Sequence, residues 1–168
     1  MDRLRYIQGY PPELQAKAEA LVESGELAGY LFNKYPDKHE VHSSKALNTY
    51  VQELKALRMR SAAPLKSVAF DNRLHQAHNA LGLHTTSTVV QGSKLKKRRE
   101  MRIASLFKDT APEFLHMIVV HELAHMKHTE HDRDFYKLCT YMEPDYHQLE
   151  FDLRLHLTVL EMESAEGS

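Results

Sequence analysis

The segment that most constrains the fold runs from Thr110 to His125, because it predicts a single buried helix. Thr110 and Glu113 offer a capping box, and Pro112 suits the first helical turn. The run Met117 to Val120 is apolar on every side of such a helix, which leaves no face suited to water. We therefore expect this helix to lie in the core, packed against a sheet.

Three ionisable residues interrupt the apolar character near the end of this predicted helix. His121 and His125 are four residues apart, so they share one face and lie one turn from each other. With Glu122 they form the HExxH arrangement, in which the histidines bind zinc and the glutamate acts on water. In a chain with twelve histidines the five letters alone are only suggestive. The alternative is a buried polar cluster satisfied by its neighbours, although a metal would offset the cost of burying these groups.

The third ligand depends on where the helix ends. His128 lies roughly 10 Å along a continuous helix from His121, too far to share an ion. His131 would lie about 240° around an unbroken helix from His125, also off the ligand face. If the helix ends near His128 and the chain turns back, His131 reaches the third position, and Asp132 as a helix cap favours that break. Glu150, on the last predicted helix, is the alternative third ligand.

The 168-residue chain suits one domain with an ordinary soluble composition, 42% hydrophobic and 27% charged with a formal net charge of −1. Its N-terminal residues contain charges and prolines where a secretory signal is apolar, and no segment is long and apolar enough to span a membrane. We expect a cytoplasmic protein with no membrane contact. Cys139 is the only cysteine and is interpreted as a core residue, so a metal site must use His, Asp or Glu.

The remaining patterns predict an α+β fold. Residues 1–62 form a helical N-terminal part, residues 63–162 contain the sheet and the active-site helices, and residues 163–168 form a frayed tail. In the first part helices are expected from Pro11 to Gly25, from Glu26 to Tyr35 and from Ser43 onward. Further helices are expected over Asn72–Leu81, from Asp132 to Tyr141 and from Pro144 to Leu160. Three short strands, forming a small sheet on the active-site helix, are expected over Ser67–Phe70, His84–Val90 and Met101–Phe107.

The segment HELAHMKHTEHDRDFY, with MRIASLFKDTAPEFLHMIVV before it and MEPDY after it, resembles the YgjP-like branch of the SprT/WLM-related zincin metallopeptidases. The resemblance implies a zincin-like domain with His121, His125 and His131 as zinc ligands and Glu122 as the catalytic base. It also matches Phe135 and Tyr136 to an aromatic pair of the family, and Pro144, Asp145 and Tyr146 to a P-D-Y segment. The family's W-G-S-C segment is reduced here to Gln91–Lys94, and the helical first sixty residues depart from its N-terminal strands.

These observations favour a zinc-dependent metallopeptidase that cleaves peptides or proteins with a zinc-activated water and Glu122 as general base. Tyr136, Tyr146 and His128 are candidates for stabilising the oxyanion or for holding the ligands. The first alternative is a zinc hydrolase with a non-peptide substrate such as nucleic acid. Some ribonucleases use an H-x3-H-x5-H motif without the glutamate, so Glu122 argues against that group. The second is a non-catalytic metal-binding module, which would not need a base beside its metal.

The basic run Lys94–Arg102 carries six positive charges in nine residues. A solvated loop is the usual meaning of such a run, and weak nucleic-acid contact is the alternative. His75, His78 and His84 fit no single-helix metal site and are interpreted as structural. The sequence indicates no oligomeric state.

Overall fold

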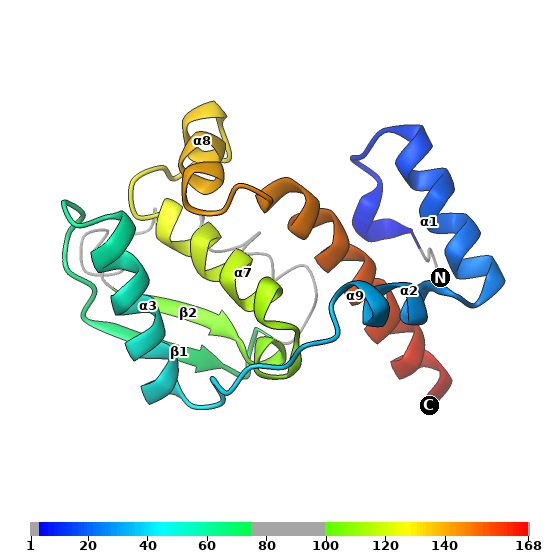
Figure 1. Cartoon of the computed structure of the whole chain (residues 1–168), viewed down its shortest axis with the longest axis horizontal. Coiled ribbons are helices and arrows are strands. Elements are labelled where there is room, and N and C mark those ends of the chain that lie inside the picture. The colour runs from blue at the N-terminus through cyan, green and yellow to red at the C-terminus, as the bar shows by residue number, and fades with distance from the viewer. Residues whose placement is uncertain (1–3, 75–99, 168) are drawn as a thin grey trace. The chain divides into compact units, whose positions relative to one another are not determined.

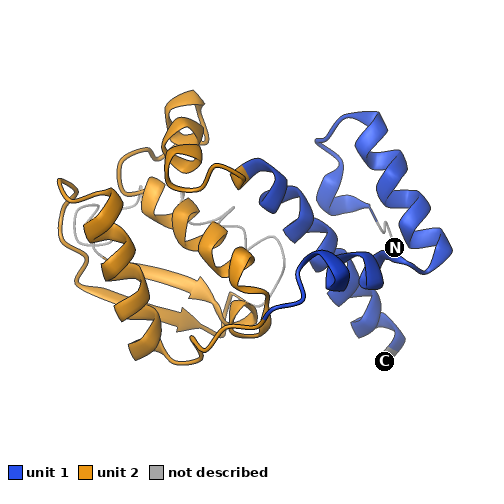
Figure 2. Ribbon diagram, in the orientation of Figure 1, with its two compact units in different colours: residues 1–37, 147–168 blue, residues 38–146 orange. Residues whose placement is uncertain are grey.

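The computed structural model describes residues 4–74 and 100–167. It divides the chain into two compact units, one of residues 1–37 and 147–168 and the other of residues 38–146 (Figure 2). The helical N-terminal part predicted over residues 1–62 is therefore shared between them: its first two helices belong to one unit and its third to the other. That residues 1–168 form a single domain stays a prediction.

The first unit is helical. It contains η1 (Arg5–Ile7), α1 (Pro12–Ser24), α2 (Leu27–Lys34) and, from its second residue onward, α9 (Tyr146–Gly167) (Figure 1). Gly25 ends α1 with φ 76°, a left-handed conformation that glycine adopts without strain, as the sequence predicted. The elements pack around a shared apolar core: Ile7, Ala18, Val22, Leu27, Leu31 and Leu155.

α9 extends seven residues beyond the expected end at Leu160 and through most of the segment expected to fray. The added residues include Glu161, Met162, Glu163, Ala165 and Glu166, which all favour helix, and no proline or capping glycine precedes Gly167. Within the same unit, the fully buried Asp152 of α9 accepts hydrogen bonds from Lys34, Tyr35 and Gln148. These contacts tie α2 and the residue after it to α9.

The second unit contains α3 (Ser44–Arg58), strands β1 (Ser67–Asp71) and β2 (Glu100–Ala104), η2 (Ser105–Asp109), α7 (Pro112–Ala124) and α8 (Arg133–Met142). α3 packs on β1, and α7 contacts both β2 and α8 (Figure 1). The strands pair in parallel, with Val68 opposite Met101 and Phe70 opposite Ile103. The described part of the chain thus contains a two-stranded sheet rather than the expected three-stranded one. The remaining predicted strand, His84–Val90, lies outside the described residues, as does most of the predicted helix Asn72–Leu81.

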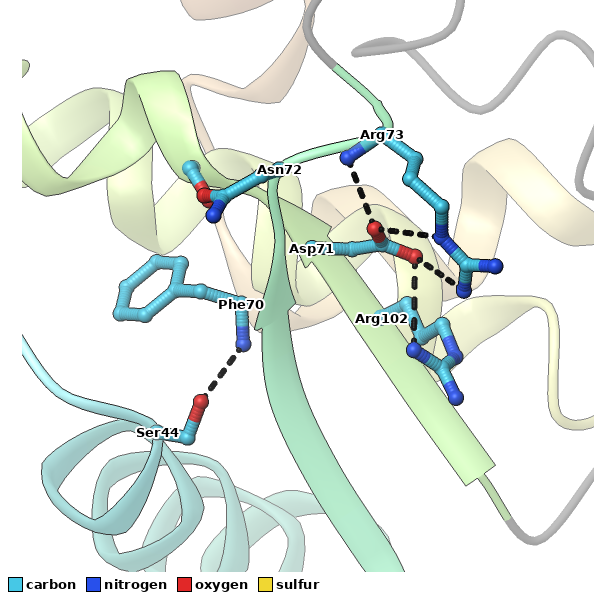
Figure 3. A network of polar contacts seen from close by, with 7 residues as sticks. Ser44, Phe70, Asp71, Asn72, Arg73 and Arg102 are labelled. Carbon is cyan, nitrogen blue, oxygen red and sulfur yellow. Dashed lines mark hydrogen bonds and ion pairs between the residues drawn. The ribbon is translucent and has the colours of Figure 1, made fainter.

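Polar contacts hold the sheet at the end of β1 (Figure 3). Asp71 is buried and accepts hydrogen bonds from Arg73, through the backbone nitrogen at 2.8 Å and the side chain at 3.2 Å. It also accepts one from Arg102 of β2 at 3.4 Å. Ser44 accepts a hydrogen bond from the backbone nitrogen of Phe70 at 3.0 Å, which joins α3 to β1.

The capping box expected at Thr110 and Glu113 is wrong. Ala111 precedes α7, and the Thr110 hydroxyl contacts the backbone oxygens of Phe107 and Ala111 instead. The hydroxyl therefore closes the end of η2 and does not cap α7. No helix in residues 4–74 or 100–167 is long and apolar enough to cross a membrane.

Candidate metal centre

The helix α7 is buried as its sequence predicted. Met117, Ile118, Val119 and Val120 are at most 1% exposed, so the apolar run has core contacts on every side. His121 and Glu122 follow within the last turn, and His125 stands directly after it. All three are buried, which places the imidazoles and the carboxyl group in an environment that penalises unpaired charge.

The chain turns after α7, as the third-ligand hypothesis required. α7 ends at Ala124, and backbone hydrogen bonds from Met126, Lys127 and His128 back to Leu123 and Ala124 form the turn. Asp132 then caps α8, its side chain accepting a hydrogen bond from the backbone nitrogen of Phe135 at 2.9 Å. The predicted break and the predicted cap are both confirmed.

The turn brings His131 to the two helical histidines. The candidate ligand atoms of His121, His125 and His131 all lie within 4.8 Å of one another. The closest pair is Nε2 of His125 and Nε2 of His131, at 2.9 Å. The ring of Phe135 lies against all three imidazoles, with centroid distances of 5.1, 4.6 and 4.9 Å. His131 is exposed while the other two are buried, so the cluster opens to solvent on the side of His131.

Hydrogen bonds orient the two buried imidazoles. Nδ1 of His125 lies 2.9 Å from the backbone oxygen of His128, and a carbonyl oxygen can only accept. The proton of neutral His125 is therefore on Nδ1, and the lone pair of Nε2 faces His131. Nδ1 of His121 lies 2.7 Å from the hydroxyl of Tyr146, which is fully buried. Two of the candidate supporting residues, His128 and Tyr146, thus contact the predicted ligands.

The third candidate, Tyr136, occupies the rim of the cluster. Its ring centroid lies 6.3 Å from that of His131 and 6.1 Å from that of Tyr146. Glu150, the alternative third ligand, belongs to the other unit. There its carboxylate accepts a hydrogen bond from Tyr10 at 3.0 Å and lies 3.9 Å from Arg154.

Burial sets the ionisation of the site. It raises the pKa of Glu122 to about 8. It also lowers the pKa of His125 to about 4, an effect that exceeds the opposing influence of the His128 carbonyl. His125 is consequently neutral at neutral pH, which is the form that binds a metal.

The donor set fits a metal ion. Three imidazole nitrogens converge, one of them demonstrably with its lone pair inward, and outer hydrogen bonds fix two of the rings. Three protein ligands on an ion that prefers four leave one coordination position for reactants. The described residues therefore include a cluster that can hold a metal, although the geometry alone does not select zinc.

Comparison with known proteins places the chain in a family. The model of the YgjP-like metallopeptidase domain matches residues 32–156, which include the whole histidine cluster and the Tyr146 that supports it. The chain belongs to the YgjP-like family. It is also 48% identical over 162 residues to the UTP pyrophosphatase of Escherichia coli (strain K12), covering 96% of this chain and 97% of that protein. No solved structure gives a significant match.

The similarity to the E. coli protein corrects the expected activity. The sequence favoured peptide-bond hydrolysis, whereas a relative of nearly the same length is a UTP pyrophosphatase, a hydrolase of a non-peptide substrate. The alternative of a metal hydrolase acting on a non-peptide substrate agrees better with this finding. The error has a chemical origin: a metal-binding histidine set with an adjacent base activates water, and activated water attacks phosphorus as well as a carbonyl carbon.

Two further residues near the predicted ligands in the chain were not among the candidates from the sequence. His116 of α7 and Glu143, directly after α8, form a contact at 2.9 Å. Neither belongs to a recognised motif. The only available signal was that His116 lies five residues before His121 on the same buried helix and Glu143 three residues before Tyr146.

Proposed function

We propose that this chain is a metal-dependent hydrolase of UTP, cleaving the bond between the α- and β-phosphates to release UMP and pyrophosphate. The observation that carries the proposal is the 48% identity to a UTP pyrophosphatase over almost the full length of both chains. The histidine cluster supports it, because hydrolysis of a phosphoanhydride needs an activated water and neutralisation of phosphate charge.

In this proposal His121, His125 and His131 hold the ion. Zinc is the proposed metal, since an all-imidazole set with three protein ligands is typical of catalytic zinc. When bound, such an ion supplies Lewis acidity, which polarises phosphate oxygens and favours ionisation of water at neutral pH. The exposed edge at His131 is the side from which a large, charged nucleotide can approach.

Glu122 is proposed as the general base. It takes the proton of the attacking water as the water oxygen bonds to the α- or the β-phosphorus atom. The bond from that phosphorus to the bridging oxygen breaks, and its electron pair leaves on the bridging oxygen with the other product, pyrophosphate or UMP. Without a metal, burial alone raises the pKa of Glu122 to about 8 and so disfavours the ionised form. A base must be ionised, and a cation held by the adjacent histidines favours the ionised carboxylate.

Three further residues have supporting roles. Tyr146 and the backbone of His128 hold His121 and His125 in position through their Nδ1 atoms. Tyr136, on the rim beside His131, is proposed to donate a hydrogen bond from its hydroxyl to a phosphate oxygen as negative charge develops there. This phosphate oxygen takes the place of the peptide oxyanion expected from the sequence.

The proposal is tested with Glu122→Gln, which keeps the size of the side chain and removes the base. The variant is expected to retain the metal content of wild type while UTP hydrolysis falls by about 100-fold or more. Glu53→Gln, an exposed carboxyl on α3, is the matched control and should hydrolyse UTP like wild type. Full activity in Glu122→Gln would refute the assigned base, and a wild type without UTP hydrolysis would refute the proposed reaction.

The expected weak nucleic-acid contact through Lys94–Arg102 stays a prediction. Lys94 to Arg99 lie outside the described residues. Arg102 forms an ion pair with Asp71.

A further inference from the structure

The short connection between α8 and α9 is tied to α7 at two points. The first point is Glu143, whose Oε1 lies 2.9 Å from Nδ1 of His116. A carboxylate can only accept, so His116 donates this hydrogen bond. The second point is Tyr146, whose hydroxyl lies 2.7 Å from Nδ1 of His121. The two histidines are five residues apart on α7. Their partners are Glu143, at the start of the connection, and Tyr146, three residues later, at the start of α9.

Internal hydrogen bonds make the connection between these points short and closed. Oε2 of Glu143 accepts a hydrogen bond from the backbone nitrogen of Asp145 at 2.9 Å. The backbone oxygen of Glu143 accepts one from the backbone nitrogen of Tyr146 at 3.0 Å. Glu143 therefore sets the geometry of the turn with three of its oxygen atoms, and the turn delivers Tyr146 to His121.

The surroundings show that Glu143 faces inward. Its side chain is 17% exposed, while Pro144 and Asp145 are exposed to solvent. Burial, together with the charge of Glu143, raises the pKa of Tyr50 on α3 to about 12. The carboxylate is thus mostly shielded from solvent, and His116 binds it directly from α7.

We propose that His116 and Glu143 are positioning residues for the metal centre, and that they act through Tyr146 on the imidazole of His121. A metal-binding histidine needs its other ring nitrogen held by a partner, because that bond sets the tautomer and the direction of the ring. Tyr146 supplies this partner only while its hydroxyl stays in place, and the contact between His116 and Glu143 anchors the turn that carries it. The inference rests on the proposed metal-binding role of His121.

A simpler interpretation is that the contact between His116 and Glu143 only stabilises the fold. The two interpretations differ in what they predict for Tyr146→Phe. If the contact acts through the Tyr146 hydroxyl, removing the hydroxyl makes the contact irrelevant to metal affinity. If it acts on general stability, its loss has the same effect with or without the hydroxyl.

The experiment is a double-mutant cycle on zinc affinity, measured on the full chain by competition with a chromogenic chelator. Tyr146→Phe is expected to weaken zinc binding by about 10-fold or more, as for other outer partners of metal-binding histidines. His116→Leu should weaken it about 3- to 10-fold. The double variant should bind zinc like Tyr146→Phe alone. His116→Asn, whose amide can replace the donor at Nδ1, should recover most of the affinity.

Two controls separate positioning from stability. Ser44→Ala removes a hydrogen bond between α3 and β1 in the same unit and should lower the melting temperature without changing zinc affinity. Thermal unfolding of the metal-free variants reports whether His116→Leu is folded, and Glu143→Gln, which keeps one acceptor oxygen, provides a milder second test.

The inference is overturned if His116→Leu binds zinc as tightly as wild type, or if it weakens binding by the same factor in the Tyr146→Phe background. A wild type that binds no zinc overturns both this inference and the proposed metal site. Because the measured quantity is zinc affinity, the result holds even if UTP proves not to be the substrate.

Discussion

Asp132 caps α8 directly after His131, so its removal tests how the start of this helix holds His131 near the other histidines. The Asp132 side chain accepts the hydrogen bond that begins α8, directly after His131. Phe135, the donor of that bond, lies against all three imidazoles. We predict that Asp132→Ala lowers both the stability of the chain and its affinity for zinc.

The magnitude follows from the geometry of the cap. Replacing an N-cap acid by alanine costs about 0.5–2 kcal/mol, and the exposure of Asp132 favours a value near 1 kcal/mol. For a chain of this size that corresponds to a fall of about 2–4 °C in melting temperature. His131 would keep its place for a smaller fraction of the time, so zinc affinity should fall by up to about 10-fold.

The assay is urea unfolding of the metal-free chain, followed by zinc titration in the presence of a competing chelator. Asp132→Asn is the matched control, because asparagine caps helices as well as aspartate and only the charge is lost. Its free energy of unfolding should fall by less than about 0.5 kcal/mol, which is the contribution of the negative charge at the helix start. The prediction is refuted if Asp132→Ala unfolds at the same urea concentration as wild type, or if Asp132→Asn loses as much as Asp132→Ala.

Three further predictions concern the core, the sheet and the metal. Val119→Ala leaves a cavity in the core around α7 and should cost about 2 kcal/mol in urea unfolding; a loss under about 0.5 kcal/mol would show that neighbouring side chains fill the space. Hydrogen bonding to Arg73 holds the pKa of Asp71 below its ordinary value, so its stabilisation is complete above about pH 4 and is lost as the pH falls through the folded-state pKa. The stability difference between wild type and Asp71→Asn should therefore shrink below about pH 4, and a difference that does not change with pH would contradict the assignment. Dialysis against a chelator should abolish UTP hydrolysis and added zinc should restore it, whereas activity that survives complete metal removal would exclude the proposed cofactor.

The histidine cluster could be predicted from the sequence because the signals that form it are local. The apolar run before His121 indicates a buried helix, the spacing to His125 gives a shared face, and Asp132 marks the start of the next helix. Each of these rules concerns a few neighbouring residues. Together they were sufficient to place His131 correctly, although it lies off the ligand face of a continuous helix.

Interactions between distant segments could not be predicted in the same way. The contact of His116 with Glu143 joins residues 27 positions apart, and no pattern in either segment indicates it. The capping box failed for a local reason, because the Thr110 hydroxyl binds the nearby backbone oxygen of Phe107 and α7 begins one residue later than the box requires. In both cases the folded chain decides which hydrogen-bonding group each side chain meets.

The substrate could not be predicted from the motif. An HExxH motif indicates a metal ion and a base, and these activate water without selecting the bond it attacks. Selection requires groups that bind the rest of the substrate. One segment that could carry such groups is Gln91–Lys94, the counterpart of the family's W-G-S-C motif, and it lies outside the described residues. The similarity to a UTP pyrophosphatase is therefore the basis of the proposed substrate.

The proposed reaction is tested most directly by the product composition when the zinc-loaded full chain is incubated with UTP. Anion-exchange chromatography separates UMP from UDP, and phosphorus NMR distinguishes pyrophosphate from inorganic phosphate. We predict equal amounts of UMP and pyrophosphate, formed by wild type and by Glu53→Gln but not by Glu122→Gln. Formation of UDP and phosphate, or no consumption of UTP by the zinc-loaded protein, would contradict the proposed reaction.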